Sequence, residues 1–148
     1  MNAATRRITE RLTSYWEEAR KGRPCPAETD IDPNDLEDVW DACFLVQIKE
    51  KPNKKHTFFY NYLGSDLLEA YGDDLTGKEI YAELLDYSTD NIAQDFENVA
   101  VSGQPMVKES EFRNRRGLLI RYRFCVLPLT NAVDKIAYLF GGMKWKAF

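Results

Sequence analysis

Hydrophobic positions near the start of the chain recur with the period of an α-helix. They form one stripe, made of Ile8, Leu12, Tyr15, Trp16 and Ala19. Gly22 and Pro24 end this segment. A helix of about 13 residues is marginal in water unless its apolar side is buried. The N-terminal stripe must therefore dock either on the outer face of its own sheet or on a second copy of the chain.

Five later segments have the composition and alternation of β-strands. They cover residues 42–48, 57–64, 106–113, 118–129 and 136–145. The first two flank a lysine-rich turn, and the last three follow one another across short polar turns. Helical patterns fill the interval between the two groups, at residues 65–72, 81–85 and 87–102. This order predicts one mostly antiparallel sheet with helices over one face, an α+β domain.

The composition is that of one folded domain. The chain has 148 residues, of which 44% are hydrophobic and 13% aromatic, enough for a single core. We divide it into an N-terminal helix and connector, residues 1–41, and a core, residues 42–148. No apolar run approaches the ~18 residues that cross a bilayer, and the first residues lack the apolar stretch of a signal peptide. We therefore expect a cytoplasmic protein without a membrane partner.

Few side chains are available for catalysis or metal binding. His56 is the only histidine, and it lies in the lysine-rich turn, where we expect it to face solvent. Cys25, Cys43 and Cys125 are far apart and form no CxxC pair, so neither a disulfide framework nor a zinc site is predicted. We expect reduced thiols, inert where they lie in apolar strands. No catalytic and no metal-binding residues are predicted.

Charge is distributed unevenly along the chain, whose net charge is −4. Residues 64–100 carry ten acidic side chains and one basic, whereas residues 101–148 carry nine basic and three acidic. The chain has no wholly basic footprint, and no nucleic-acid partner is expected. Two glutamates of one predicted strand lie beside two arginines of the next, which favours cross-strand ion pairs. These four residues are Glu109, Glu111, Arg121 and Arg123.

Two blocks of the chain resemble a known family. The first is LTSYWEEARKGRPCPAETDIDPNDLEDVW, with its TDIDP sequence, followed by FLVQI. The second is YNYLGSDLLEAYGDDLTGKEI, followed further on by GQP before a strand, then VLPL and LFGGM. Together they cover nearly the whole chain and resemble the PAS superfamily, most closely a bacterial family of single PAS domains often found in alphaproteobacteria.

The resemblance implies a PAS fold, in which a five-stranded antiparallel sheet of order 2-1-5-4-3 encloses a pocket with its helices. PAS domains act as sensory or interaction modules, so we expect a non-catalytic protein in bacterial signalling. Its partner is then a small apolar or aromatic ligand, or a signalling protein in trans. The candidate pocket residues are Phe58, Tyr60, Tyr62, Leu68, Tyr71, Ile92, Phe96, Tyr122 and Phe124. Because PAS modules often dimerise through flanking helices, the resemblance favours a homodimer with the N-terminal stripe at its interface.

Two cofactors of this superfamily can be compared with the residues present. A haem-binding PAS domain usually has an axial ligand such as histidine on its long helix, and residues 87–102 contain none. A light-sensing flavin PAS domain has a reactive cysteine in an NCRFLQ-like motif ahead of its helix, and the block after the second strand has no cysteine. These residues disfavour haem and flavin photochemistry, and we predict no cofactor. Non-covalent binding of a flavin stays open at this point.

One alternative of another class stays open. Small cone-shaped enzymes similar to the NTF2-like hydrolases and isomerases also have this length and an apolar pocket. These proteins begin with long helices and usually place an Asp/His or Asp/Tyr pair in the cone. Here two strands precede the central helices, which fits this alternative poorly.

Overall fold

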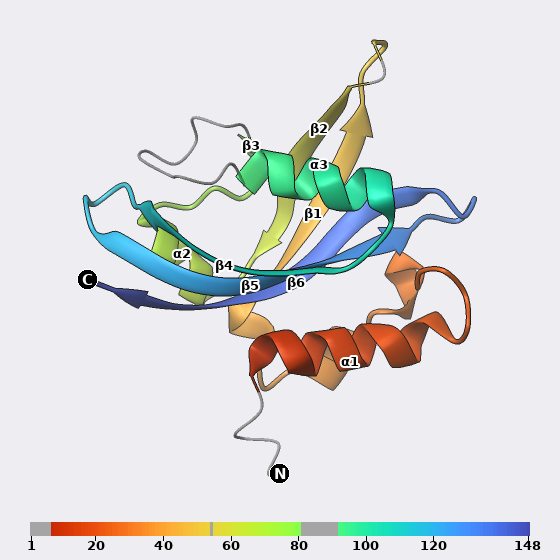
Figure 1. The fold of residues 1–148 in the computed structure, drawn as a ribbon, viewed down its shortest axis with the longest axis horizontal. Helices are drawn as coiled ribbons and strands as arrows, with labels where there is room; N and C mark the ends of the chain where they lie inside the picture. Colours follow the sequence, from red (N-terminus) through yellow and green to blue (C-terminus); the bar gives the residue numbers. More distant parts are fainter. Residues whose placement is uncertain (1–6, 54, 81–91) are drawn as a thin grey trace.

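A computed structural model describes residues 7–53, 55–80 and 92–148 (Figure 1). The helices are α1 (Ile8–Arg20), α2 (Ser65–Tyr71) and α3 (Ile92–Ser102), with short 3-10 helices at Glu28–Asp30, Pro33–Leu36 and Trp40–Ala42. The strands are β1 (Cys43–Glu50), β2 (His56–Leu63), β3 (Glu79–Ile80), β4 (Met106–Arg113), β5 (Leu119–Thr130) and β6 (Ile136–Ala147). The predicted helix at 81–85 and the first part of the helix predicted at 87–102 lie outside the described residues.

The strands form one antiparallel sheet in the order β3-β2-β1-β6-β5-β4. The α+β class is confirmed, but the predicted count of five strands is wrong, since the sheet has six. The additional strand, β3, has two residues and pairs with β2, where Ile80 lies opposite Phe58. A strand this short has no alternating pattern for sequence analysis to detect. With β3 set aside, the remaining strands neighbour one another in the predicted order.

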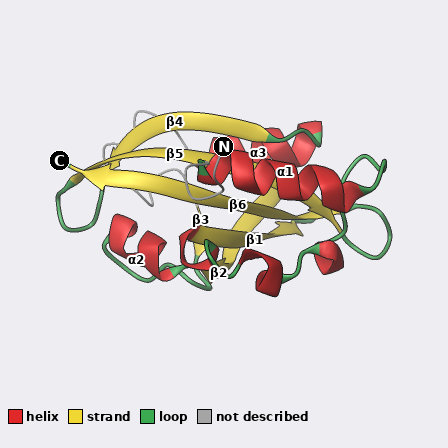
Figure 2. Cartoon of the chain, turned by 90° about the horizontal axis from the view of Figure 1, so that it is seen from below, coloured by secondary structure: helices red, strands yellow, loops and turns green. Residues whose placement is uncertain are grey.

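Helices cover both faces of this sheet rather than one. α2 and α3 pack on the face that we call inner, and α1 packs on the opposite, outer face, over β5 and β6 (Figures 1 and 2). Each face therefore has its own apolar core, with the sheet between them. None of the helices in the described ranges is long and apolar enough to cross a membrane.

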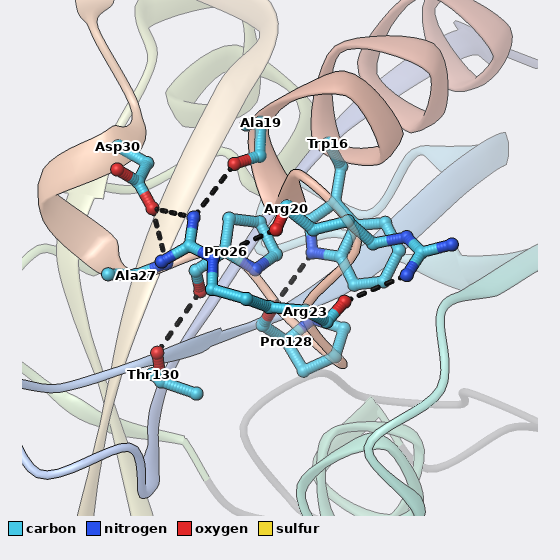
Figure 3. A network of polar contacts seen from close by, with 9 residues as sticks. All are labelled: Trp16, Ala19, Arg20, Arg23, Pro26, Ala27, Asp30, Pro128 and Thr130. Carbon is cyan, nitrogen blue, oxygen red and sulfur yellow. Dashed lines mark hydrogen bonds and ion pairs between the residues drawn. The ribbon is translucent and has the colours of Figure 1, made fainter.

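The N-terminal segment takes the place of a strand beside the end of β5 (Figure 3). β4 pairs with β5 only as far as Val126. Beyond that point the indole Nε1 of Trp16 donates to the carbonyl oxygen of Pro128 at 2.8 Å. The backbone N–H of Thr130 donates to the carbonyl oxygen of Pro26 at 2.9 Å. Because proline has no N–H to donate to a sheet, it is tolerated where a strand is locally an edge. The two bonds give partners to backbone groups that burial would otherwise leave unpaired.

Two arginines connect the end of α1 to the connector that follows it (Figure 3). The guanidinium of Arg23 donates to the carboxylate of Asp30 at 2.6 Å and to the carbonyl oxygen of Ala19 at 2.9 Å. Arg20 donates in turn to the carbonyl oxygen of Arg23 at 2.8 Å. The bond from Arg23 is the main reason that the pKa of the Asp30 carboxyl lies below its usual value. The connector is thereby held in the extended path that brings it to β5.

Adjacent glycines in β6 let both faces of the sheet pack closely. A Cβ on Gly142 would lie 2.6 Å from Cδ1 of Leu12, so the missing side chain lets α1 approach the sheet. A Cβ on Gly141 would overlap the carbonyl oxygen of Cys125 and lie 2.6 Å from the ring of Phe44. Successive residues of a strand point to opposite faces. Gly142 therefore makes room on the outer face and Gly141 on the inner face.

The N-terminal stripe is buried within its own chain. Leu12 is 0% exposed and Trp16 is 3% exposed, in one cluster with outer-face residues of β5 and β6. Ile8 and Tyr15 pack at the margin of the same cluster, and Ala19 is half-buried. This corrects the assignment of the stripe to a dimer interface, because Leu12 and Trp16 leave no apolar surface for a second copy. A homodimer through another surface stays a prediction.

Candidate functional site

Eight aromatic side chains form one continuous cluster on the inner face of the sheet. We call it the inner aromatic cluster, and its members are Phe44, Phe58, Tyr60, Tyr71, Phe96, Phe112, Tyr122 and Phe124. They come from four strands and from α2 and α3, and none is more than 5% exposed. Neighbouring ring centroids lie between 5.2 and 6.4 Å apart. At such distances aromatic pairs attract one another beyond the effect of burial alone.

One hydrogen bond lies inside this apolar cluster. The hydroxyl oxygens of Tyr60 and Tyr71 are 2.7 Å apart, and both rings are buried. Burial raises the pKa of both phenols above the ordinary value near 10, so both hydroxyls keep their protons at neutral pH. Among the described residues neither hydroxyl has a second hydrogen-bond partner. Since the pair has two protons and shares one bond, one proton is left without an acceptor there.

The turn between β4 and β5 positions the end of α2, which carries Tyr71. The buried Asn114 donates from Nδ2 to the carbonyl oxygen of Ala70 at 3.1 Å. The backbone N–H of Arg115 donates to the carbonyl oxygen of Tyr71 at 3.0 Å. Asn114 Oδ1 also accepts backbone N–H groups of the turn itself, which holds the amide in place. The buried tyrosine therefore lies at the end of a short helix whose last turn is hydrogen-bonded to the turn between β4 and β5.

An ion pair and a histidine–carboxylate contact attach α3 to the sheet. Lys108 of β4 lies 3.0 Å from the carboxylate of Asp95, whose side chain is only 7% exposed. His56 Nδ1 lies 3.0 Å from Oε2 of Glu97. The expectation that His56 faces solvent in a turn is wrong, because His56 is the first residue of β2 and its side chain is directed at α3. A turn that ends one residue earlier than expected accounts for the difference.

Seven of the nine predicted pocket residues lie in the inner core. These are Phe58, Tyr60, Tyr71, Ile92, Phe96, Tyr122 and Phe124. Leu68 packs against the same core from α2 and is partly buried. Tyr62 lies instead on the outer face, where its ring stacks on Trp40 with centroids 4.7 Å apart and its hydroxyl donates to the carbonyl oxygen of Trp40 at 2.9 Å.

A β-bulge explains the position of Tyr62. Val46 pairs with Tyr60, and the preceding residue Leu45 pairs with Tyr62, so Asn61 has no partner of its own on β1. An additional residue in one strand reverses the alternation of side chains beyond it. Tyr62 therefore leaves the face that Phe58 and Tyr60 share.

Sequence reasoning missed two members of the inner aromatic cluster. Phe44 lies in an apolar run, from Ala42 to Val46, in which both faces of the strand are hydrophobic and no alternation assigns a side. Phe112 lies between the charged residues Glu111 and Arg113, and a period of two puts it on the same face of the strand as Lys108. Which face of the sheet that is cannot be read from the charged residues around it. The cross-strand partner of Phe112 is Ile120, which is also in the inner core.

The three cysteines lie on the outer side of the sheet, away from the inner aromatic cluster. Cys25, Cys43 and Cys125 all belong to the core beneath α1 and carry free thiols. Burial raises the pKa of Cys43 and of Cys125 to about 12, which keeps both thiols protonated. No thiol is therefore available on the inner face for a covalent bond to a flavin. Within the described ranges no group of three His, Cys, Asp or Glu side chains could hold a metal ion.

A family model described as PAS domain matches residues 4–144 of this chain. The chain belongs to the PAS domain family. PAS domains are sensory modules, and this membership excludes the NTF2-like alternative. No curated protein matches the sequence.

Solved structures show the same fold at low sequence identity. The light-state structure of the blue-light photoreceptor Aureochrome1 LOV matches with a TM-score of 0.54 and 13% identity, over 75% of this chain and 85% of that one. A light-oxygen-voltage domain studied with a flavin analogue matches with a TM-score of 0.58 and 8% identity, over 76% and 82%. The PAS domain of the fruit-fly ELK potassium channel matches with a TM-score of 0.55 and 13% identity, over 75% and 91%.

Proposed function

We propose that this chain is a non-catalytic sensory module that binds a small apolar or aromatic molecule at the inner aromatic cluster and signals to a protein partner in trans. The observation that carries the proposal is the convergence of four strands and two helices on one mostly apolar cluster that contains a hydrogen-bonded pair of phenols, Tyr60 and Tyr71. Small-molecule sites in proteins are mostly apolar, with a few placed polar groups that orient the ligand.

The tyrosine pair indicates which ligands suit this cluster. One of its two hydroxyl protons has no acceptor among the described residues, so a ligand with a carbonyl or similar oxygen would supply one. Because burial raises the pKa of both phenols, the ligand meets two neutral hydroxyls and no negative charge. A neutral aromatic molecule with one acceptor is therefore favoured over a cation.

A ligand has to displace side chains to enter, since the described members of the cluster are packed against one another. α3 is the element best suited to move. Its contact with the sheet through His56 and Glu97 is partly open to solvent on both sides, and in the Lys108–Asp95 pair the lysine is partly exposed while Asp95 is buried. Displacement of α3 would change the surface that the domain presents to a partner, which is how binding would become a signal.

Native mass spectrometry of protein purified without added ligand tests the proposal first, because it reports bound molecules directly. Acetophenone and ethylbenzene then serve as matched probes of similar shape, of which only the first has a carbonyl oxygen. In titrations followed by the backbone amide signals of the protein, we expect acetophenone to bind several-fold more tightly. The variant with Tyr60→Phe and Tyr71→Phe keeps both rings and should bind the two probes equally.

The proposal fails if the purified protein carries no small molecule and neither probe shifts signals from the inner core. Equal binding of the two probes by the wild-type chain would remove the role of the tyrosine pair alone. We expect colourless protein, because the thiols lie on the other side of the sheet and the one histidine is bound to Glu97. Stoichiometric haem or flavin absorbance would contradict this. The cytoplasmic location and the kinship with bacterial single PAS domains stay predictions.

A further inference from the structure

The outer face of the sheet is only partly covered by α1. Figure 2 shows that the C-terminal part of β6, with the adjoining parts of β5 and β4, extends beyond the start of this helix. Two rows of charged side chains cross these strands in register. They are Glu109–Arg123–Lys144 and Glu111–Arg121–Lys146.

The charges in these rows are not balanced. Arg123 forms an ion pair with Glu109, and Arg121 lies 3.2 Å from the carboxylate of Glu111, as the sequence predicts. The two lysines of β6 are exposed and form no ion pair with any described residue. Each stands directly across from an arginine, and like charges in that position destabilise a sheet. Four cations thus share two carboxylates, and an added anion would relieve their repulsion.

A hollow of about 1700 Å³ runs over the two rows, past the start of α1 and around the end of β6. Phe148 lines it and is 63% exposed. Trp145 reaches the edge of the hollow from the other face of β6, where it packs against the inner core and donates from Nε1 to the carbonyl oxygen of Asp66. The guanidinium of Arg121 lies 4.6 Å from the centroid of the Phe148 ring. Arginine, tryptophan and tyrosine are enriched among the few residues that dominate the binding energy of protein–protein interfaces.

We propose that this charged groove binds an acidic segment of a partner protein that also carries apolar side chains. Carboxylates of the segment would meet Lys144 and Lys146, and its apolar side chains would cover Phe148. The far rim of the groove carries Asp41 and Asp66, which would repel the phosphates of a nucleic acid, whereas Asp38 there forms an ion pair with Arg11. A segment that touches only the sheet side avoids this rim. The two charged rows lie on the opposite face of the sheet from the inner aromatic cluster, so Lys144 and Lys146 are not part of the ligand site proposed there.

A labelled peptide tests the groove. Fluorescence anisotropy measures binding of a fluorescein-labelled twelve-residue peptide of alternating glutamate and leucine, with a lysine–leucine peptide for comparison. We expect the acidic peptide alone to bind, and to bind more weakly as salt increases. The variant with Lys144→Glu and Lys146→Glu should weaken binding by about tenfold. It removes like-charge contacts, so its urea unfolding midpoint should not fall.

The matched control carries Lys51→Glu and Lys55→Glu, the same change of net charge on exposed lysines of the β1–β2 turn. It should bind the acidic peptide as the wild-type chain does. An equal loss in both variants would reduce the effect to net charge and overturn the proposal, as would the absence of binding by the wild-type chain. Sedimentation measures whether the protein is a monomer or a dimer. A wild-type dimer that the Lys144 and Lys146 variant converts to monomer would show that a second copy covers the groove, and would also overturn it.

Discussion

The indole N–H of Trp16 and the carbonyl oxygen of Pro128 are 112 positions apart in sequence and 2.8 Å apart in the fold. Their hydrogen bond is buried between α1 and the part of β5 that β4 does not reach. α1 is therefore an integral part of the sheet's outer layer. Its stability and that of the core should change together, because each covers surface of the other.

Trp16→Phe should lower the free energy of unfolding by about 1–3 kcal/mol, because it leaves the buried carbonyl of Pro128 without a donor while an aromatic ring remains. Urea denaturation measures the change. Tyr15→Phe is the matched control, since it removes hydrogen bonds to Asp32 and Asp35 that are exposed to water. The control should cost less. An equal loss in both variants would mean that the Trp16 bond has no special weight.

Gly142→Ala should destabilise the protein by about 1–3 kcal/mol through overpacking against α1. The added Cβ would lie 2.6 Å from Cδ1 of Leu12 and 2.9 Å from that of Ile8. Combining it with Leu12→Ala should cost less than the sum of the two single changes, because the shortened side chain makes room. Unfolding curves of the wild-type chain, the two single variants and the double variant make up this double-mutant cycle. Strict additivity would show that Gly142 and α1 do not compete for space.

High pH should destabilise the protein through the tyrosine pair. Burial raises the pKa of Tyr60 and Tyr71 above 10, so the unfolded chain loses these protons first and stability falls as pH rises above about 10. Each phenol contributes a slope of at most about 1.4 kcal/mol per pH unit. The variant with Tyr60→Phe and Tyr71→Phe should show a shallower fall between pH 10 and 11. Parallel curves for the two proteins would contradict a raised pKa.

The thiols should report whether α1 is docked. At pH 8 the native protein should react slowly with Ellman's reagent, because burial raises the pKa of Cys43 and Cys125 to about 12 and the helix covers them. The variant with Leu12→Glu and Trp16→Glu places two charges in the outer core and should expose the thiols. A variant that stays folded with protected thiols would show that α1 is dispensable for the outer face.

Local sequence patterns were sufficient for most elements of this fold. The stripe in α1, the end of α2 at Gly72 and the charge pairing of Glu111 with Arg121 all depend on residues close together or on regular hairpin register. The inner position of Phe58 and Tyr60 also follows from simple alternation along one strand. Such features can be predicted without knowing how distant segments of the chain pack against them.

Tertiary structure decided the features that depend on distant partners. The bulge at Asn61 sends Tyr62 to the outer face, and only the pairing with β1 defines that bulge. The N-terminal stripe is equally apolar whether it meets its own sheet or a second copy, and the space above Gly142 decides for its own sheet. The bond between Tyr60 and Tyr71 requires a helix and a strand to meet inside the core. Periodicity records which side of an element is apolar, but the partner of that side is set by packing across the whole chain.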